Sequence, residues 1–169
     1  MKFEILRTEL AHNAETIQKL LSGIAQEQAQ RKPAPDSWSL LEVVCHLYDE
    51  EREDFRQRLD IMLHRPEEKW PPINPVGWVT ERKYNQQDFS TMVAKWAAER
   101  EQSLAWLDGL STPDWETETT TPFGTMKAGD MFAAWVTHDT LHMRQLVELR
   151  HEHVLNITAP YDGRYAGDW

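Results

Sequence analysis

The chain has 169 residues, one cysteine and a formal net charge of -10. This length suits one domain with its own core, and a single cysteine, Cys45, excludes an internal disulfide. The negative charge argues against nucleic acid or an anionic membrane surface as a partner, because phosphate binding needs a basic surface. We therefore expect one domain over residues 1–169, with a C-terminal tail from about residue 154.

No apolar run in the sequence approaches the roughly 18 residues of a membrane span. The N-terminal residues 1–4 lead into a charged helical pattern rather than into the apolar core of a signal peptide. Together with the single cysteine, this predicts a cytoplasmic protein.

The first half of the chain shows two helical patterns. Apolar residues recur at helical spacing over residues 2–29 and again over residues 40–63. Pro33 and Pro35 interrupt the chain between them, and Ser39 with Glu42 forms a capping-box sequence at the start of the second helix.

A long connection follows at residues 64–87, where four prolines and a glycine predict irregular structure. Its tryptophans, Trp70 and Trp78, serve either as a pocket wall or as anchors of the loop. Such long connections often cover a functional site. A third helix is predicted over residues 88–110, and Arg100 in its apolar stripe either pairs with an acidic neighbour or faces a pocket.

The last part of the chain crosses back and ends in a fourth helix. Threonines favour extended chain over residues 111–126, with a turn at 122–124, and residues 128–150 have helical spacing. An irregular tail follows from about residue 156, and it is expected to lie over the bundle or across to a partner. The predicted fold class is all-α, a four-helix bundle with a long irregular connection between helices 2 and 3.

Two histidines four residues apart, His138 and His142, leave the same face of the fourth helix. They lie on its inner stripe, where apolar residues are expected. They are therefore either buried, hydrogen-bonded core histidines or residues whose chemistry needs a dry pocket. His46 lies beside the buried stripe of the second helix, and periodicity alone does not distinguish it. The sequence His151-Glu152-His153 most simply complements the helix dipole.

A histidine pair of this kind supplies two metal ligands without backbone strain. A third ligand from a facing helix would complete a site that keeps positions open for water or substrate. Three imidazole nitrogens suit zinc, nickel, iron or copper rather than magnesium or calcium.

Three motifs together resemble the DinB-like (DinB/YfiT) four-helix superfamily: residues 38–47 (WSLLEVVCHL), residues 123–124 (FG) and residues 138–146 (HDTLHMRQL). The resemblance extends over nearly the whole chain. It implies a metal, most commonly zinc or nickel, held by His46, His138 and His142, and it implies a homodimer.

The same resemblance implies a metal-dependent enzyme of the thiol S-transferase type, in which a low-molecular-weight thiol attacks a small-molecule substrate. The alternatives are a metal-dependent hydrolase, a non-catalytic metal-binding or stress-response protein, and a bundle without metal. Glu50, Asp49 and Asp139 are candidates for acid/base or supporting roles, although the acidic run 49–54 is most simply a solvated helix face. We expect the open side of the site to face the loop at 64–87.

Overall fold

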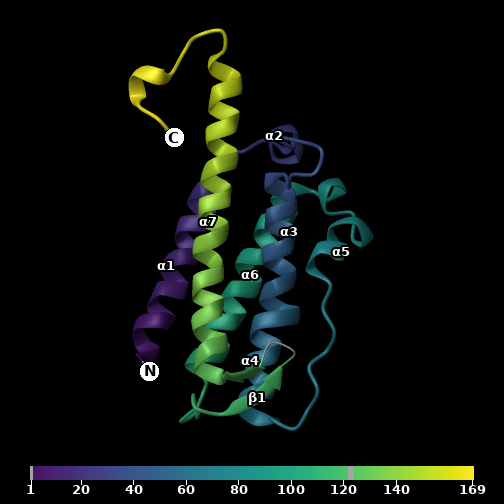
Figure 1. Ribbon diagram of the computed structural model, residues 1–169, viewed down its shortest axis with the longest axis vertical. Helices are drawn as coiled ribbons and strands as arrows, with labels where there is room; N and C mark the ends of the chain where they lie inside the picture. The colour runs from purple at the N-terminus through teal and green to yellow at the C-terminus, as the bar shows by residue number, and fades with distance from the viewer. Residues whose placement is uncertain (1, 122–123) are drawn as a thin grey trace.

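The computed structural model describes residues 2–121 and 124–169. Four long helical segments lie side by side, some pairs parallel and others antiparallel (Figure 1). They are α1 (Phe3–Leu21), α3 (Leu40–Glu50) continued through η1 (Glu51–Phe55) into α4 (Arg56–His64), α6 (Phe89–Asp108) and α7 (Ala128–Thr158). The predicted all-α four-helix bundle is confirmed. No helix in the described ranges has the length and hydrophobicity needed to cross a membrane.

Contacts between side chains define the directions of these helices. The Phe3 ring packs against the Phe132 ring, and Arg150 donates to the carbonyl of Leu20, so α1 and α7 run parallel. Arg7 at the start of α1 binds Asp108 at the end of α6, so those two helices are antiparallel.

Helices α3 and α6 run in the same direction, because Ser39 contacts Asn85 just before α6, and Arg56 contacts Ser103. Two parallel neighbours need a connection that returns along the whole bundle. The long segment between α4 and α6 provides it, along the right of Figure 1. This connection is less irregular than predicted, since it contains α5 (Pro75–Glu81) and a 3-10 turn, η2 (Tyr84–Gln86). Asn74 caps α5 and proline occupies its first turn, which explains the helix.

Several other boundaries differ from the predictions. The first helix ends at Leu21, because Gly23 takes a left-handed conformation with φ of 75°, and a short α2 (Gln26–Gln30) follows it. The threonine-rich crossing forms a hairpin of β1 (Glu118–Thr121) and β2 (Gly124–Lys127), paired antiparallel from Glu118 opposite Lys127 to Thr121 opposite Gly124. Most of the predicted turn at 122–124 lies outside the described residues.

Helix α7 continues to Thr158, eight residues beyond the predicted end at 150. Its last turns rise above the rest of the bundle in Figure 1, and the tail folds back from them. The tail carries a further 3-10 turn, η3 (Arg164–Ala166), and is largely exposed.

The second helix contains an irregularity that periodicity does not reveal. Residues Glu51–Phe55 form a π-helical turn, which widens the helix by one residue per turn and shifts the faces that follow. Glu51, Asp54 and Phe55 are buried in this turn, and Asp49 and Glu50 are buried in the α-helix just before it. The interpretation of residues 49–54 as a solvated face is therefore wrong for most of the run.

Candidate metal centre

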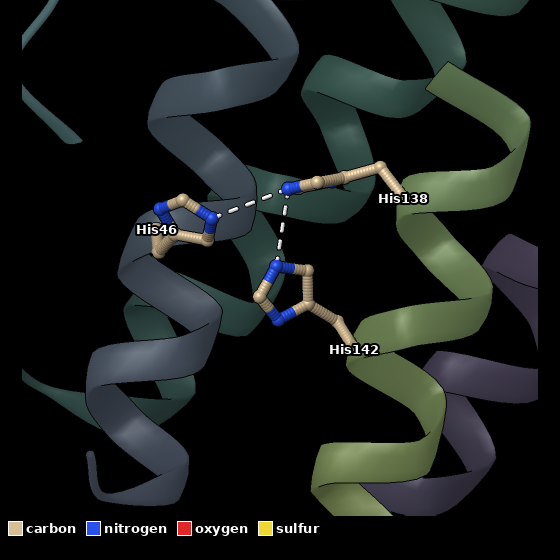
Figure 2. A group of neighbouring side chains, drawn as sticks. All are labelled: His46, His138 and His142. Atoms are coloured by element: carbon tan, nitrogen blue, oxygen red, sulfur yellow. Dashed lines mark hydrogen bonds between the residues drawn. The ribbon is translucent and has the colours of Figure 1, made fainter. Parts of the chain in front are cut away.

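The three predicted metal ligands come from two facing helices. Helix α3 begins with the predicted capping box, in which the Ser39 hydroxyl accepts from the amide of Glu42 at 3.2 Å and the Glu42 carboxylate accepts from the amide of Ser39 at 2.9 Å. His46 lies two turns further along this helix. It faces His138 and His142, which leave one side of α7 (Figure 2).

The three imidazoles meet through one nitrogen each. The Nε2 atoms of His46 and His138 lie 3.3 Å apart, and those of His142 and His138 lie 3.1 Å apart. Nitrogen ligands about 2.0–2.1 Å from a single ion are separated by about 2.9 Å at 90° and about 3.4 Å at 109°. These two separations lie between the two values, and ligand atoms of all three histidines lie within 4.8 Å of one another, so the cluster is compatible with one face of a metal site.

Burial keeps these imidazoles neutral. Removal from water, and then the neighbouring His142, lowers the pKa of His46 to about 3. Burial and the other two histidines lower the pKa of His138 to about 2, with a smaller contribution from Arg100. Burial also lowers the pKa of His142, opposed by its hydrogen bond to Gln145. An unprotonated imidazole is the form that binds a metal.

The second nitrogen of each imidazole determines which way the ring points. The Nδ1 of His142 lies 2.9 Å from the Oε1 of Gln145, so a hydrogen on Nδ1 leaves the Nε2 lone pair directed at the cluster. The Nδ1 of His46 lies 3.9 Å from the Oε1 of Glu50, and both atoms are buried without a hydrogen bond. A small movement would close this contact.

The residues present fit a transition-metal ion. Three neutral imidazole nitrogens directed at one point are the donor set of zinc, nickel, iron or copper. In the part of the chain that the structure describes, the Nε2 atoms of the cluster hydrogen-bond only among themselves, and the buried Nδ1 of His46 has no hydrogen-bond partner. Among the residues that the structure describes, these three histidines form a group of side chains that could hold a metal ion.

Apolar rings shield the cluster from water. The Trp38 ring approaches His46 edge-on at 4.9 Å between centroids, and the Phe55 ring lies 4.9 Å from His138. Trp38 directly precedes the cap of α3, and Phe55 comes from the π-helical turn. The sequence alone places neither residue at the site. The position of Trp38 depends on the capped start of α3, and that of Phe55 depends on the π-helical turn.

The three acidic candidates have different surroundings. Asp49 accepts from the Tyr84 hydroxyl and pairs with Arg82, so it ties α3 to the connection. Asp139 pairs with the buried Arg100. Only Glu50, of these three, faces a histidine of the cluster. Burial, and then the neighbouring Asp54, raises the pKa of Glu50.

A cavity of about 670 Å³ opens beside the cluster, with His142, Gln145 and Trp38 among its lining residues. Its remaining walls come from the segment before α3, the outer part of α7 and the end of the tail. We expected the open side of the site to face the loop at 64–87, but no residue of that loop lines this cavity, so the expectation is wrong. Trp78 is buried against Arg82 and Trp70 lies against Arg58, so both tryptophans anchor the loop.

The other histidines lie away from the cluster. His12 is exposed on α1. His151 stacks on Trp169 with 4.0 Å between ring centroids, and His153 lines a separate smaller cavity. The structure brings none of them to the three-histidine group.

Fold and site together define a class: a four-helix bundle in which histidines of two facing helices converge on a site of the dimensions a transition metal requires. A family model described as the DinB superfamily matches residues 9–146. The chain belongs to the DinB superfamily.

Comparison with solved structures agrees with this fold. The chain is similar to YfiT from Bacillus subtilis, with a TM-score of 0.78 and 16% sequence identity over 89% of this chain and 87% of that one. That protein is described as a probable metal-dependent hydrolase with an unusual four-helix bundle topology. No curated protein matches the sequence.

Proposed function

We propose that the protein is a metal-dependent enzyme whose His46, His138 and His142 hold a divalent transition-metal ion, zinc or nickel, through Nε2. The single observation that carries the proposal is the convergence of the three Nε2 atoms, at 3.1 and 3.3 Å, in a neutral cluster that is largely withdrawn from water. When bound, such an ion lowers the pKa of a coordinated thiol or water and keeps the deprotonated nucleophile available at neutral pH.

The chain's own residues prepare this site in three ways. Gln145 fixes the ring of His142, and Glu50 is placed to accept from Nδ1 of His46. Trp38 and Phe55 exclude water from two sides. The cavity beside His142 gives a small molecule access.

Thiol S-transfer is the reaction we propose first. Among the residues that the structure describes, the one carboxylate in contact with the cluster, that of Glu50, lies on the Nδ1 side of His46. In the described residues no carboxylate contacts an Nε2 atom of the cluster, so none is placed there as a base, and the three carboxylates of the cavity lining belong to its walls. A thiol needs only to lose its proton and be held, whereas attack by water commonly uses a positioned base.

Metal-dependent hydrolysis is the second candidate, and the description of YfiT favours it. The two reactions share the same site and differ in the nucleophile. The homodimer and the cytoplasmic location remain predictions.

The test uses protein purified without a histidine tag and loaded with zinc or nickel, with 1-chloro-2,4-dinitrobenzene as the electrophile. A bond forms between the thiol sulfur and the ring carbon, the carbon–chlorine bond breaks, chloride leaves with the electron pair, and the thiol proton goes to the buffer. We expect a screen of small thiols to find a rate that requires metal and is lost in the double variant His138→Ala/His142→Ala.

The control for hydrolysis is release of 4-nitrophenol from 4-nitrophenyl acetate without thiol. A metal-dependent rate in this assay alone would replace thiol transfer by hydrolysis. If neither assay exceeds the metal-free control, the protein binds metal without turnover.

A further inference from the structure

The cavity beside His142 has an unusual distribution of charge. Three carboxylates line it, those of Asp36, Glu148 and Glu152, and its lining contains no lysine or arginine. Its apolar lining includes the rings of Trp38 and Trp169. The cavity is part of the candidate metal centre, because His142 forms its inner wall and Trp38 contacts His46.

Nearby cations do not cancel these carboxylates. Arg144 reaches Glu148 at 3.5 Å from the exposed side of α7, and within the described residues Asp36 and Glu152 have no ion-pair partner. Lys32 is held by Glu42 at 2.8 Å. Lys32 and Arg31 line the separate cavity of about 190 Å³, which shares Glu152.

The same cavity is therefore lined both by carboxylates and by His142, one of the three proposed metal ligands. A cleft lined by one sign of charge concentrates ligands of the opposite sign. Tryptophan faces add to this preference, because they attract cations, especially ammonium groups. Trp169 stacks on His151 with an interplanar angle of 7°, yet it remains 73% exposed and available to a ligand.

We propose that this cavity is the substrate pocket and that its ligand carries an ammonium group a few atoms from the reacting atom. The inference rests on the proposed function for the reacting end of the ligand. The ammonium group binds between the carboxylates and the tryptophans, while the nucleophilic end reaches the three histidines. An aminothiol carries the positive charge that this pocket favours. A thiol with a carboxylate in place of the ammonium group carries a negative charge, which the carboxylates of the pocket would repel.

The pocket can be tested without turnover, by titrating metal-free protein with three ligands of similar size: benzylamine, benzyl alcohol and phenylacetate. Tryptophan fluorescence reports the dissociation constant, since Trp38 and Trp169 line the cavity. We expect benzylammonium to bind about 3- to 10-fold more tightly than benzyl alcohol at low ionic strength, and phenylacetate more weakly than either.

The matched variants are Glu148→Gln/Glu152→Gln in the cavity and Glu9→Gln/Glu101→Gln on exposed parts of α1 and α6. Both remove two negative charges. We expect only the cavity variant to lose the preference for the cation. Equal binding of the three ligands, no binding by any of them, or the same loss in both variants would overturn the proposal.

A second assay compares cysteamine, 2-mercaptoethanol and 3-mercaptopropionate in the thiol-transfer reaction. Each rate is divided by the rate of the same thiol with metal-free protein, which corrects for intrinsic thiol reactivity. We expect the order cysteamine, 2-mercaptoethanol, 3-mercaptopropionate, and the reverse order would contradict the inference. No metal-dependent rate with any thiol would instead remove thiol transfer, while the binding titration would still decide the charge preference.

Discussion

Two buried polar clusters lie side by side along α7, and adjacent residues belong to them: His138 to the histidine cluster and Asp139 to the arginine cluster. In the arginine cluster, the Arg100 guanidinium donates five hydrogen bonds, two to Glu51, two to Asp139 and one to the carbonyl of Leu10. The Trp135 indole donates to Glu51 as well. Every donor of this arginine is therefore used.

The histidine cluster is less deeply buried, since His46 is buried and His138 and His142 are half-buried, and its nitrogens are not satisfied in the same way. Among the residues described, its Nε2 atoms hydrogen-bond only to one another, and Nδ1 of His46 has no hydrogen bond. Electrostatics differ too: burial removes the charge of His46 and His138. Although burial lowers the pKa of Arg100, Glu51 and Asp139 raise it above its ordinary value, so the charge is kept. The arginine cluster, whose hydrogen-bond donors are all used, is therefore structural. The neutral histidine cluster, whose nitrogens keep unused hydrogen-bonding capacity, can bind a ligand.

The largest expected effect comes from breaking the arginine cluster. Arg100→Met leaves two carboxylates buried without their partner, and we expect a loss of about 3–5 kcal/mol in the free energy of unfolding. Urea unfolding of the metal-free protein measures it. Replacing the whole cluster, with Glu51→Leu and Asp139→Leu added, should recover most of the loss, since the uncompensated charges are then gone. A loss below 1 kcal/mol in Arg100→Met would show that the cluster is not a stabilising unit.

An intermediate effect is expected at Glu50, the residue that faces the histidine cluster without binding it. Glu50→Leu removes the carboxyl oxygen that lies 3.9 Å from Nδ1 of His46 and is placed to accept from it once the contact closes, and we expect metal affinity to fall by about 10- to 100-fold. Competition with a chromophoric chelator measures this dissociation constant. Glu50→Gln retains an acceptor oxygen and should lose less.

Asp49→Asn is the matched control for Glu50, since Asp49 is the next residue along the helix and is equally buried but faces Tyr84 and Arg82. Unchanged metal affinity in Glu50→Leu, or an equal loss in Asp49→Asn, would mean that Glu50 does not position His46.

The smallest change in the free energy of unfolding is expected at an exposed ion pair. Like the arginine cluster, this pair joins an arginine to a carboxylate, but it lies at the surface. Arg7 donates two hydrogen bonds to Asp108, but the side chain of Asp108 is 55% exposed. Water screens such pairs, so Arg7→Met should cost about 0–1 kcal/mol in the same urea experiment. A loss equal to that of Arg100→Met would break the contrast between buried and exposed pairs.

Much of the fold could be predicted from the sequence, because the signals were local. The capping box at Ser39, the Asp88 cap of α6 and the helical spacing of apolar residues each depend on neighbouring residues in the chain. The π-helical turn at 51–55 and the continuation of α7 to Thr158 depend on packing. The hairpin depends on pairing between two short segments, which single-segment propensity does not reveal.

The site shows the same division. His138 and His142 could be paired from their spacing, because four residues on a helix define one face. His46 lies on a different helix and required the family resemblance, since its position relative to α7 is set by the packing of α3. The role of Gln145 had a signal in its spacing of three residues from His142, whereas nothing local indicated that Asp36 and Trp169 would line one cavity.

The most direct test of the central claim is the metal content of protein purified without a histidine tag, compared with that of His138→Ala/His142→Ala. The account predicts about one equivalent of zinc or nickel per chain in the unaltered protein, bound through three imidazoles, and none in the folded double variant. Substoichiometric metal that is unchanged by the double substitution would contradict it. Circular dichroism of both proteins establishes that the comparison is between folded chains.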